Sequence, residues 1–227
     1  MAIERARTTL GQVFLQRCFY LFAGVLTLVT VVLLLEPTPR GRMLVNAITL
    51  LMDVSAVAAV GRTRVSFVLA CLLAILAMLF LVRAINDESP AHLLVSWTFS
   101  GALYAVTIGY LMRYVFRRDV MTADKLYGAA ASYLMLGVLW AYLYAIAGYL
   151  QPGSFGFGGN AMSPPLIDLV YFSFTTLTST GFGDFTPLLR GVRALCVLEQ
   201  LTGALFLAIL IARLAGVYPP RQGSREG

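Results

Sequence analysis

A run of small hydroxyl residues followed by two glycines carries the most distinctive chemistry in this sequence. Residues 175–184 read Thr-Thr-Leu-Thr-Ser-Thr-Gly-Phe-Gly-Asp. Glycine reaches left-handed and right-handed backbone conformations without a Cβ clash, so a segment that alternates between them turns successive carbonyl oxygens the same way. Several copies around an axis would form stacked oxygen cages that replace the hydration shell of a cation. Ser179 would add hydroxyl oxygens at the inner mouth, and Asp184 would hold negative charge at the outer mouth.

The composition is that of a membrane protein, because 59% of the 227 residues are hydrophobic and only 12% are charged. A bilayer core of about 30 Å needs roughly 20 apolar residues in a helix. A shorter apolar stretch, 164–178, ends in the glycine segment and is predicted to be a re-entrant half-helix. The sequence therefore predicts an all-α membrane protein. Six stretches are long enough to span the bilayer: 14–35, 43–60, 65–85, 91–116, 126–150 and 192–216.

The half-helix is expected to begin at Ser163-Pro164-Pro165, with Ser163 as its N-cap. Its far end would point carbonyl oxygens, and the negative end of its dipole, beneath the glycine segment, which favours a cation there. A second Gly-Phe-Gly, at 156–158, follows no apolar run and lies among Gly, Pro and Ser residues. That copy is predicted to be a loop.

Residues 179–184, Ser-Thr-Gly-Phe-Gly-Asp, resemble the filter of potassium channels, whose usual form is Thr-Val-Gly-Tyr-Gly-Asp. The similarity continues upstream through 168–178, which looks like the pore helix of the tetrameric potassium channel superfamily. The resemblance implies a homotetramer that conducts K⁺ passively, with K⁺ at the filter as its only metal ion. It assigns K⁺ coordination to Thr178, Ser179, Thr180, Gly181, Phe182 and Gly183, and the outer mouth to Asp184.

The same resemblance implies residues that support the filter and residues that gate the pore. Tyr171 and Phe172 stand where many relatives carry a Trp pair, and Thr175 and Glu199 are expected to support the filter with them. Gly203 lies where the family usually has a hinge glycine, although glycine is equally common where membrane helices pack closely. The expected gate and hinge residues are Gly203, Ala208, Ile211 and Ala212.

Two departures from the family pattern keep alternatives open. Thr180 replaces the usual Val, and Phe182 lacks the tyrosine hydroxyl that commonly ties the filter to the pore helix. A weakly selective monovalent cation channel of the same architecture is therefore one alternative, and a non-conducting membrane scaffold is a more distant one. An enzyme is not expected, because the chain has one His and no metal cluster or Ser/His constellation. No cofactor and no nucleic-acid partner are implied; the expected partners are other copies of the chain, membrane lipids and K⁺.

Three titratable residues lie in or beside the apolar stretches. Two hypotheses apply to Glu199: it is a structural hydrogen-bond acceptor for the pore helix, or it is a proton-sensitive gate. The second reading predicts that Glu199→Gln alters open probability or its pH dependence. Asp53 is predicted to pair with Arg113. His92 is expected to be a solvated interfacial residue, with an external pH sensor as the alternative.

The division of the chain follows from the position of the filter. Residues 1–119 form a four-helix domain in the position of a voltage sensor, but 91–112 carries no Lys or Arg, so strong voltage gating is not expected. Residues 120–218 form the pore domain and 219–227 a short cytoplasmic tail. For the stimulus that opens the pore, the sequence leaves four alternatives: lipid, membrane tension, an unfamiliar voltage mechanism and constitutive opening.

Basic residues predict the orientation in the membrane. Twelve of the seventeen fall on the side of the N-terminus, which favours cytoplasmic termini in a multi-pass protein of the plasma membrane, or of the inner membrane in a bacterium. Three isolated cysteines, Cys18, Cys71 and Cys196, imply no disulfide or metal framework. The basic residues on the opposite side are Arg40, Arg42, Arg83, Arg190 and Arg193.

Overall fold

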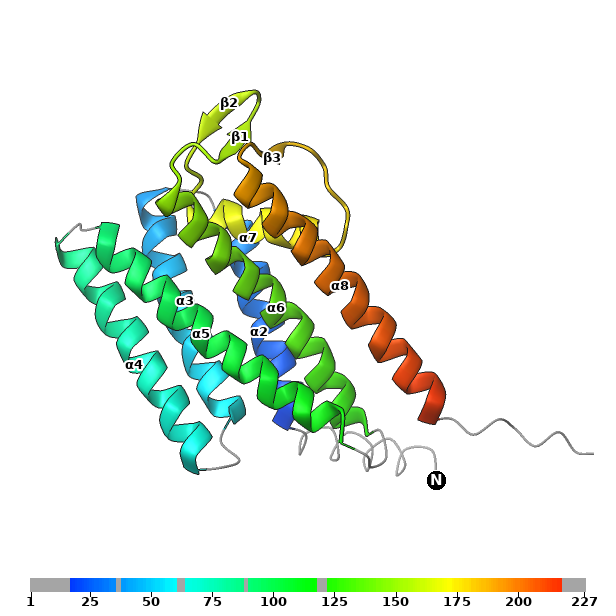
Figure 1. The fold of residues 1–227 in the computed structure, drawn as a ribbon. Helices are drawn as coiled ribbons and strands as arrows, with labels where there is room; N and C mark the ends of the chain where they lie inside the picture. The colour runs from blue at the N-terminus through cyan, green and yellow to red at the C-terminus, as the bar shows by residue number, and fades with distance from the viewer. Residues whose placement is uncertain (1–16, 36–37, 61–63, 88–89, 118–121, 218–227) are drawn as a thin grey trace, which may run out of the picture.

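A computed structural model describes residues 17–35, 38–60, 64–87, 90–117 and 122–217, and these residues are mostly helical (Figure 1). A small sheet lies at one end of the helices, above a short helix. Residues 178–184, which follow this helix, are called the filter segment because of the resemblance described above. The helices are α2 (Arg17–Leu34), α3 (Pro39–Val60), α4 (Arg64–Asp87), α5 (Pro90–Val115), α6 (Ala123–Leu150), α7 (Leu166–Leu177) and α8 (Arg190–Val217). The strands are β1 (Phe155–Phe157), β2 (Asn160–Met162) and β3 (Phe185–Pro187).

Four of the described helices are long and apolar enough to cross a membrane, which identifies a multi-pass membrane protein. They contain the segments Ser66–Asn86, Pro90–Val115, Ala123–Leu150 and Arg190–Ala215. The sequence predicted six such spans. Among the described residues, the apolar segments of α2 and α3 are shorter: Cys18–Leu34 and Met43–Val57.

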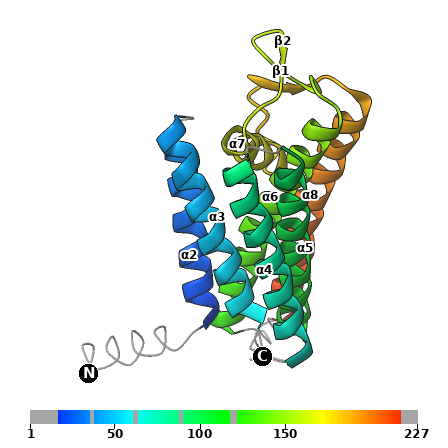
Figure 2. The same ribbon diagram turned by 90° about the vertical axis from the view of Figure 1, so that its left-hand side faces the viewer.

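The early helices pack directly on the helices that hold the filter segment. Helix α5 lies against α4 and α6, while α2 lies against α3, α6 and α7. Figure 2 shows α2 and α3 on one side of α6 and α8 on the other. One core cluster joins side chains from six helices, α2 to α7, so the predicted boundary at 119/120 falls between α5 and α6 without a break in packing. Its members include Val25, Met52, Leu103, Met135 and Val170.

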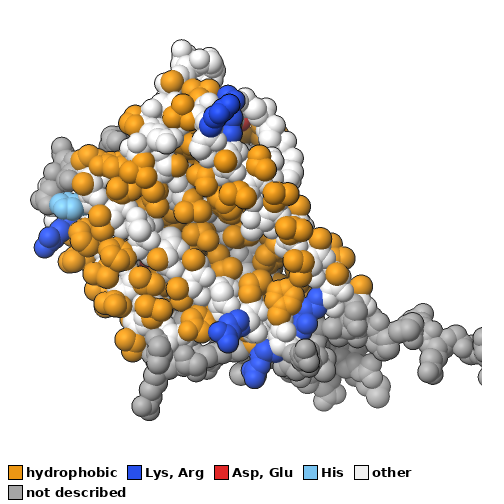
Figure 3. Space-filling view, in the orientation of Figure 1, with side chains coloured by type: hydrophobic (Ala, Val, Ile, Leu, Met, Phe, Trp, Pro, Cys, Tyr) orange, Lys and Arg blue, Asp and Glu red, His pale blue; other side chains and the backbone are white. Residues whose placement is uncertain are grey.

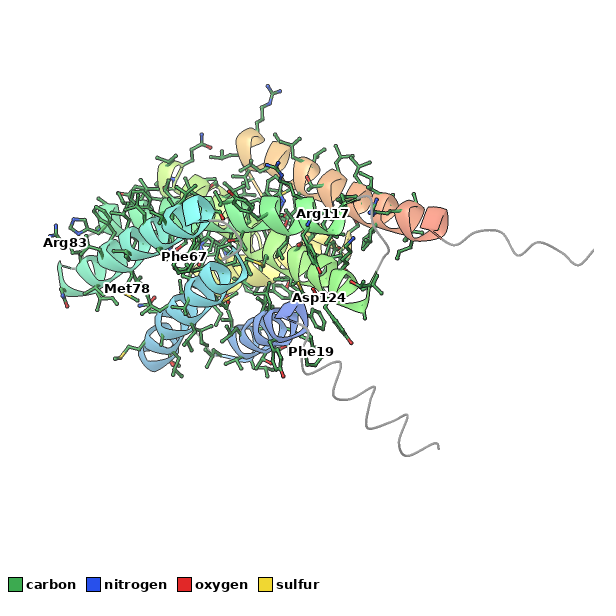
Figure 4. The ribbon with its side chains drawn as sticks, turned by 90° about the horizontal axis from the view of Figure 1, so that it is seen from below. Phe19, Phe67, Met78, Arg83, Arg117 and Asp124 are labelled. Atoms are coloured by element: carbon green, nitrogen blue, oxygen red, sulfur yellow. The ribbon has the colours of Figure 1, made fainter. Side chains whose placement is uncertain are left out.

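Asp124 ties three helices together at the end of the molecule away from the sheet (Figure 4). Helix α6 begins after Thr122, whose hydroxyl accepts a hydrogen bond from the N–H of Lys125, and Asp124 lies in its first turn. A carboxylate is favoured there by the positive end of the helix dipole. Its Oδ1 accepts from the backbone N–H of Cys18 over 2.9 Å, and its Oδ2 accepts from the Tyr114 hydroxyl over 2.7 Å.

The segment between α6 and α7 forms a hairpin, so the predicted loop at 156–158 is wrong. Strand β1 pairs antiparallel with β2 on one edge and with β3 on the other. The hairpin turns at Gly158 and Gly159, whose φ angles are +56° and +85°. A two-residue turn of this kind requires positive φ at both positions, which a Gly-Gly pair provides. The described residues are otherwise mostly helical, which agrees with the predicted all-α membrane protein, and the sheet adds three strands of three residues each.

Candidate functional site

The helix that leads into the filter segment is α7, and it begins two residues later than the prediction from 164–178. Its N-cap is Pro165, at φ −66° and ψ 161°, with no side-chain capping bond. The N-cap prediction for Ser163 is therefore wrong. A proline disfavours helical geometry in the residue before it, so Pro165 keeps Pro164 extended and delays the helix. Asp168 lies in the first turn.

The filter segment alternates between backbone conformations. The φ angle is +57° at Ser179, +54° at Gly181 and +80° at Gly183, and Thr180 and Phe182 between them are not left-handed. A left-handed conformation costs a residue with a Cβ about 1–2 kcal/mol, so Ser179 is held in place by its surroundings. Residues 178–184 are all exposed in the single chain. Alternation of this kind is the backbone geometry expected to turn successive carbonyl oxygens toward one side.

The start of the filter segment is held by the last carbonyl groups of α7. The Thr175 carbonyl oxygen accepts hydrogen bonds from the N–H groups of Thr180 and Gly181, over 2.8 and 3.2 Å. The N–H of Ser179 donates to the Thr176 carbonyl oxygen over 2.9 Å. Thr175 thus contacts the filter segment through its backbone, while its hydroxyl donates to the Phe172 carbonyl oxygen.

The hydroxyl of Thr180 lies toward α7. Thr178 Oγ1 donates to the Phe174 carbonyl oxygen over 2.7 Å, and the Oγ1 atoms of Thr178 and Thr180 are 2.8 Å apart. Because Thr178 gives its hydrogen to Phe174, Thr180 donates to Thr178. Thr180, which replaces the usual Val, therefore adds a hydrogen bond to Thr178 at the end of α7.

Tyr171 holds the outer end of the segment in two ways. Its hydroxyl donates to Asp184 Oδ2 over 2.9 Å. Its ring lies parallel to that of Phe182, with 6.4 Å between centroids and 4° between planes. Asp184 Oδ1 also accepts from the N–H of Phe185, where β3 begins. The outer end is therefore fixed both to α7 and to the sheet.

Glu199 joins three helices behind the segment. It is fully buried, and its two oxygens accept from Tyr144 Oη on α6 and Ser173 Oγ on α7, each over 2.5 Å. Ser173 Oγ also lies 2.7 Å from the Gly137 carbonyl oxygen. The Phe172 ring packs on that of Tyr144, 5.0 Å away. Sequence reasoning missed Tyr144 and Ser173, because the rotation of three helices decides which hydroxyls face Glu199.

Gly203 lies against the C-terminal end of α7. A Cβ at this position would lie 2.3 Å from the Leu177 carbonyl oxygen, closer than any real contact. That oxygen also accepts from the Tyr133 hydroxyl over 3.4 Å. Of the two readings of Gly203, this geometry favours close packing. The other predicted gate residues, Ala208, Ile211 and Ala212, lie on the exposed surface of α8.

The predicted pair between Asp53 and Arg113 is wrong. Asp53 is buried and accepts from the Ser100 hydroxyl over 3.1 Å. Arg113 lies in the last turn of α5, about 20 Å along the helix from Ser100 at 1.5 Å per residue. His92 lies beside the Phe80 ring, 6.0 Å between centroids. Within the described ranges no group of three His, Cys, Asp or Glu residues is arranged to hold a metal ion, and the three cysteines are free thiols.

Residues 131–218 match a family model described as an ion channel. The match takes in most of α6, the sheet, α7, the filter segment and α8, and so includes Glu199 and Gly203. It supports an ion channel, which is a non-enzymatic function, for the part of the chain that holds the filter segment. Among curated proteins, none matches the chain.

Proposed function

We propose that this chain is one subunit of a potassium-selective channel whose pore is formed by four copies. The alternation of φ at Ser179, Gly181 and Gly183 carries the proposal. Oxygens from Thr178 through Gly183 would surround dehydrated K⁺ in single file, and repulsion between neighbouring ions would offset the binding. The conduction is passive, and it involves no covalent chemistry or cofactor.

The exposed surfaces of the single chain support an oligomer. One filter segment supplies one wall of a pore, so closed symmetry with further copies is required to surround an ion. Helix α8 beside it is also largely exposed, because only 17% of the residues in its most apolar stretch are buried. The apolar side chains exposed along it are Val197, Leu198, Leu201, Leu205, Leu207, Ile209 and Ile211.

The surroundings of the segment favour a cation on the axis. Asp184 would place four carboxylates at the outer mouth, and four α7 helices would direct the negative ends of their dipoles beneath the filter. Lys and Arg side chains at the other end of the molecule would face the cytoplasm, together with both termini, in the plasma membrane or a bacterial inner membrane.

Potassium flux into liposomes that contain the purified protein tests the proposal. We expect flux from the wild-type protein and its loss in Gly181→Ala. No atom lies within 4 Å of a Cβ built at Gly181, so the substitution strains only the left-handed backbone, by about 1–2 kcal/mol per copy. Gly109→Ala on α5, where a Cβ also meets nothing within 4 Å, is the matched control. Absence of flux under every condition would favour a non-conducting scaffold.

A weakly selective cation channel is the second candidate. The observation that favours it is the contact at Phe182, which lacks a hydroxyl and is held to Tyr171 by ring stacking. Reversal potentials in K⁺/Na⁺ gradients separate the two. A potential near the K⁺ equilibrium value supports the selective channel, and one near zero supports the alternative.

A further inference from the structure

The ends of α5 and α8 farthest from the sheet enclose an apolar cavity. Its volume is about 150 Å³, and every side chain that lines it is apolar. Because residues three and four apart share a helix face, each helix contributes one continuous strip. The lining residues are Met112 and Val115 from α5, Phe116 directly after its end, and Phe206, Ile209 and Leu210 from α8.

Arg213 lies at the rim of this cavity, one turn beyond Ile209 and Leu210. Its Nη2 donates to the carbonyl oxygen of Arg117, and its guanidinium lies 5.4 Å from the centre of the Phe116 ring. Its Nε is buried and has no hydrogen-bond partner among the residues that the structure describes. The chain therefore places a cationic guanidinium at the rim and satisfies its hydrogen bonds only in part.

Two more arginines lie on the same rim. Arg113 and Arg117 are both exposed, four residues apart near the end of α5. Figure 3 shows Lys and Arg side chains gathered at the lower end of the molecule, and Figure 4 places Arg117 between α5 and α8. The nearby Asp124 accepts from Cys18 and Tyr114, on the other side of α5. In the described part of the chain, no ion pair with a carboxylate neutralises Arg113, Arg117 or Arg213.

We propose that this rim and cavity bind an anionic phospholipid. The phosphate would lie at Arg117 and Arg213, and part of one acyl chain would fill the cavity. Basic pockets between membrane helices bind anionic headgroups, and each Lys or Arg near the surface strengthens such binding about five-fold. A free phosphate would use the arginines alone. The adjoining apolar cavity, which a phosphate ion cannot fill, selects the lipid.

The bound lipid would join α5 to the far end of α8. In the channel proposed above, that end of α8 carries Ala208, Ile211 and Ala212, so occupancy would hold the inner mouth in one position. This consequence for conduction rests on the proposed function. The binding itself does not.

Mass spectrometry of the intact, delipidated protein measures the binding directly, by titration with phosphatidylglycerol or with phosphatidylcholine of the same acyl chains. We expect phosphatidylglycerol to bind at least about ten-fold more tightly. Arg213→Gln and Arg117→Gln should each weaken it about five-fold. The control is Arg83→Gln, which removes an exposed arginine near the C-terminal end of α4, away from the cavity. It should leave phosphatidylglycerol binding unchanged.

A cavity variant tests the acyl part of the site. Leu210→Trp should fill the cavity and weaken phosphatidylglycerol binding while all three arginines remain. Equal affinity for the two lipids, or equal effects of Arg213→Gln and Arg83→Gln, would overturn the proposal. So would displacement of the lipid by inorganic phosphate at the same concentration. Selective binding without K⁺ flux would support the lipid site and count against the channel.

Discussion

Gly203 packs against the carbonyl oxygen of Leu177, so that a Cβ at 203 would lie 2.3 Å from that oxygen. Leu177 is the last residue of α7, and the filter segment begins at the next residue. The inner helix therefore touches the backbone that supports the filter at a point where no side chain fits. This contact gives Gly203 a structural requirement that does not depend on bending.

Gly203→Ala is expected to destabilise the assembled protein by about 3 kcal/mol or more. Overpacking a well-packed site costs about 1–3 kcal/mol, and here the opposing atom is backbone, which yields less than a side chain. Thermal melting of the purified protein measures the loss. Gly109→Ala is the control and should melt at or slightly above the wild-type temperature, because alanine favours a helix. A stable Gly203→Ala protein with altered opening would instead support the hinge.

The left-handed backbone at Gly181 and Gly183 could be predicted from sequence because it is a local property of glycine. Glycines at 181 and 183 permit the left-handed geometry that the structure has at both positions. The position of α7 was predicted to within two residues, and its start was missed because a pair of prolines lies at the boundary. Such features depend on the conformational limits of individual residues.

Contacts between distant segments could not be predicted in the same way. The sheet needs β3, which follows the filter, to pair with β1, which precedes α7. Asp53 was assigned to Arg113 by charge, but the rotation and height of α5 bring Ser100 to it. Likewise, Tyr144 and Ser173 reach Glu199 only after α6, α7 and α8 are packed.

Glu199→Ala is expected to cost more stability than Glu199→Gln. Alanine removes the carboxylate that accepts from the buried Tyr144 hydroxyl and opens a cavity, which together cost about 3–5 kcal/mol. Ser173 keeps the Gly137 carbonyl oxygen as an acceptor. Glutamine keeps the shape and one acceptor oxygen. Thermal melting should therefore rank wild type above Glu199→Gln above Glu199→Ala. Equal melting of the two variants would mean that the hydrogen bonds contribute little.

Glu199→Gln also distinguishes the two readings of this residue. A proton-sensitive gate predicts that wild-type open probability changes between about pH 5 and 8 in planar bilayers, and that the Gln variant loses this change. A purely structural acceptor predicts currents that do not depend on pH in either protein. Indistinguishable currents across this range would reject the gate.

The Gly-Gly turn is expected to position the outer end of the filter through the sheet. Gly159→Ala places a Cβ at φ +85°, which costs about 1–2 kcal/mol, although no atom lies within 4 Å of the new group. The strain should loosen β1 and therefore β3, whose first residue is Phe185. Amide exchange should accelerate at Phe185 and Thr186 of β3 and remain unchanged in α5. Equal exchange in the two proteins would show that the hairpin does not support β3.

Tyr171→Phe and Asp184→Asn test the bond at the outer end of the filter segment. Tyr171→Phe removes the hydroxyl that donates to Asp184 but keeps the ring that stacks on Phe182. We expect each single variant to lower K⁺ selectivity over Na⁺, measured from reversal potentials. The double variant should lower it little further, because residues that share one bond are not additive. Strictly additive effects would mean that the two side chains act separately.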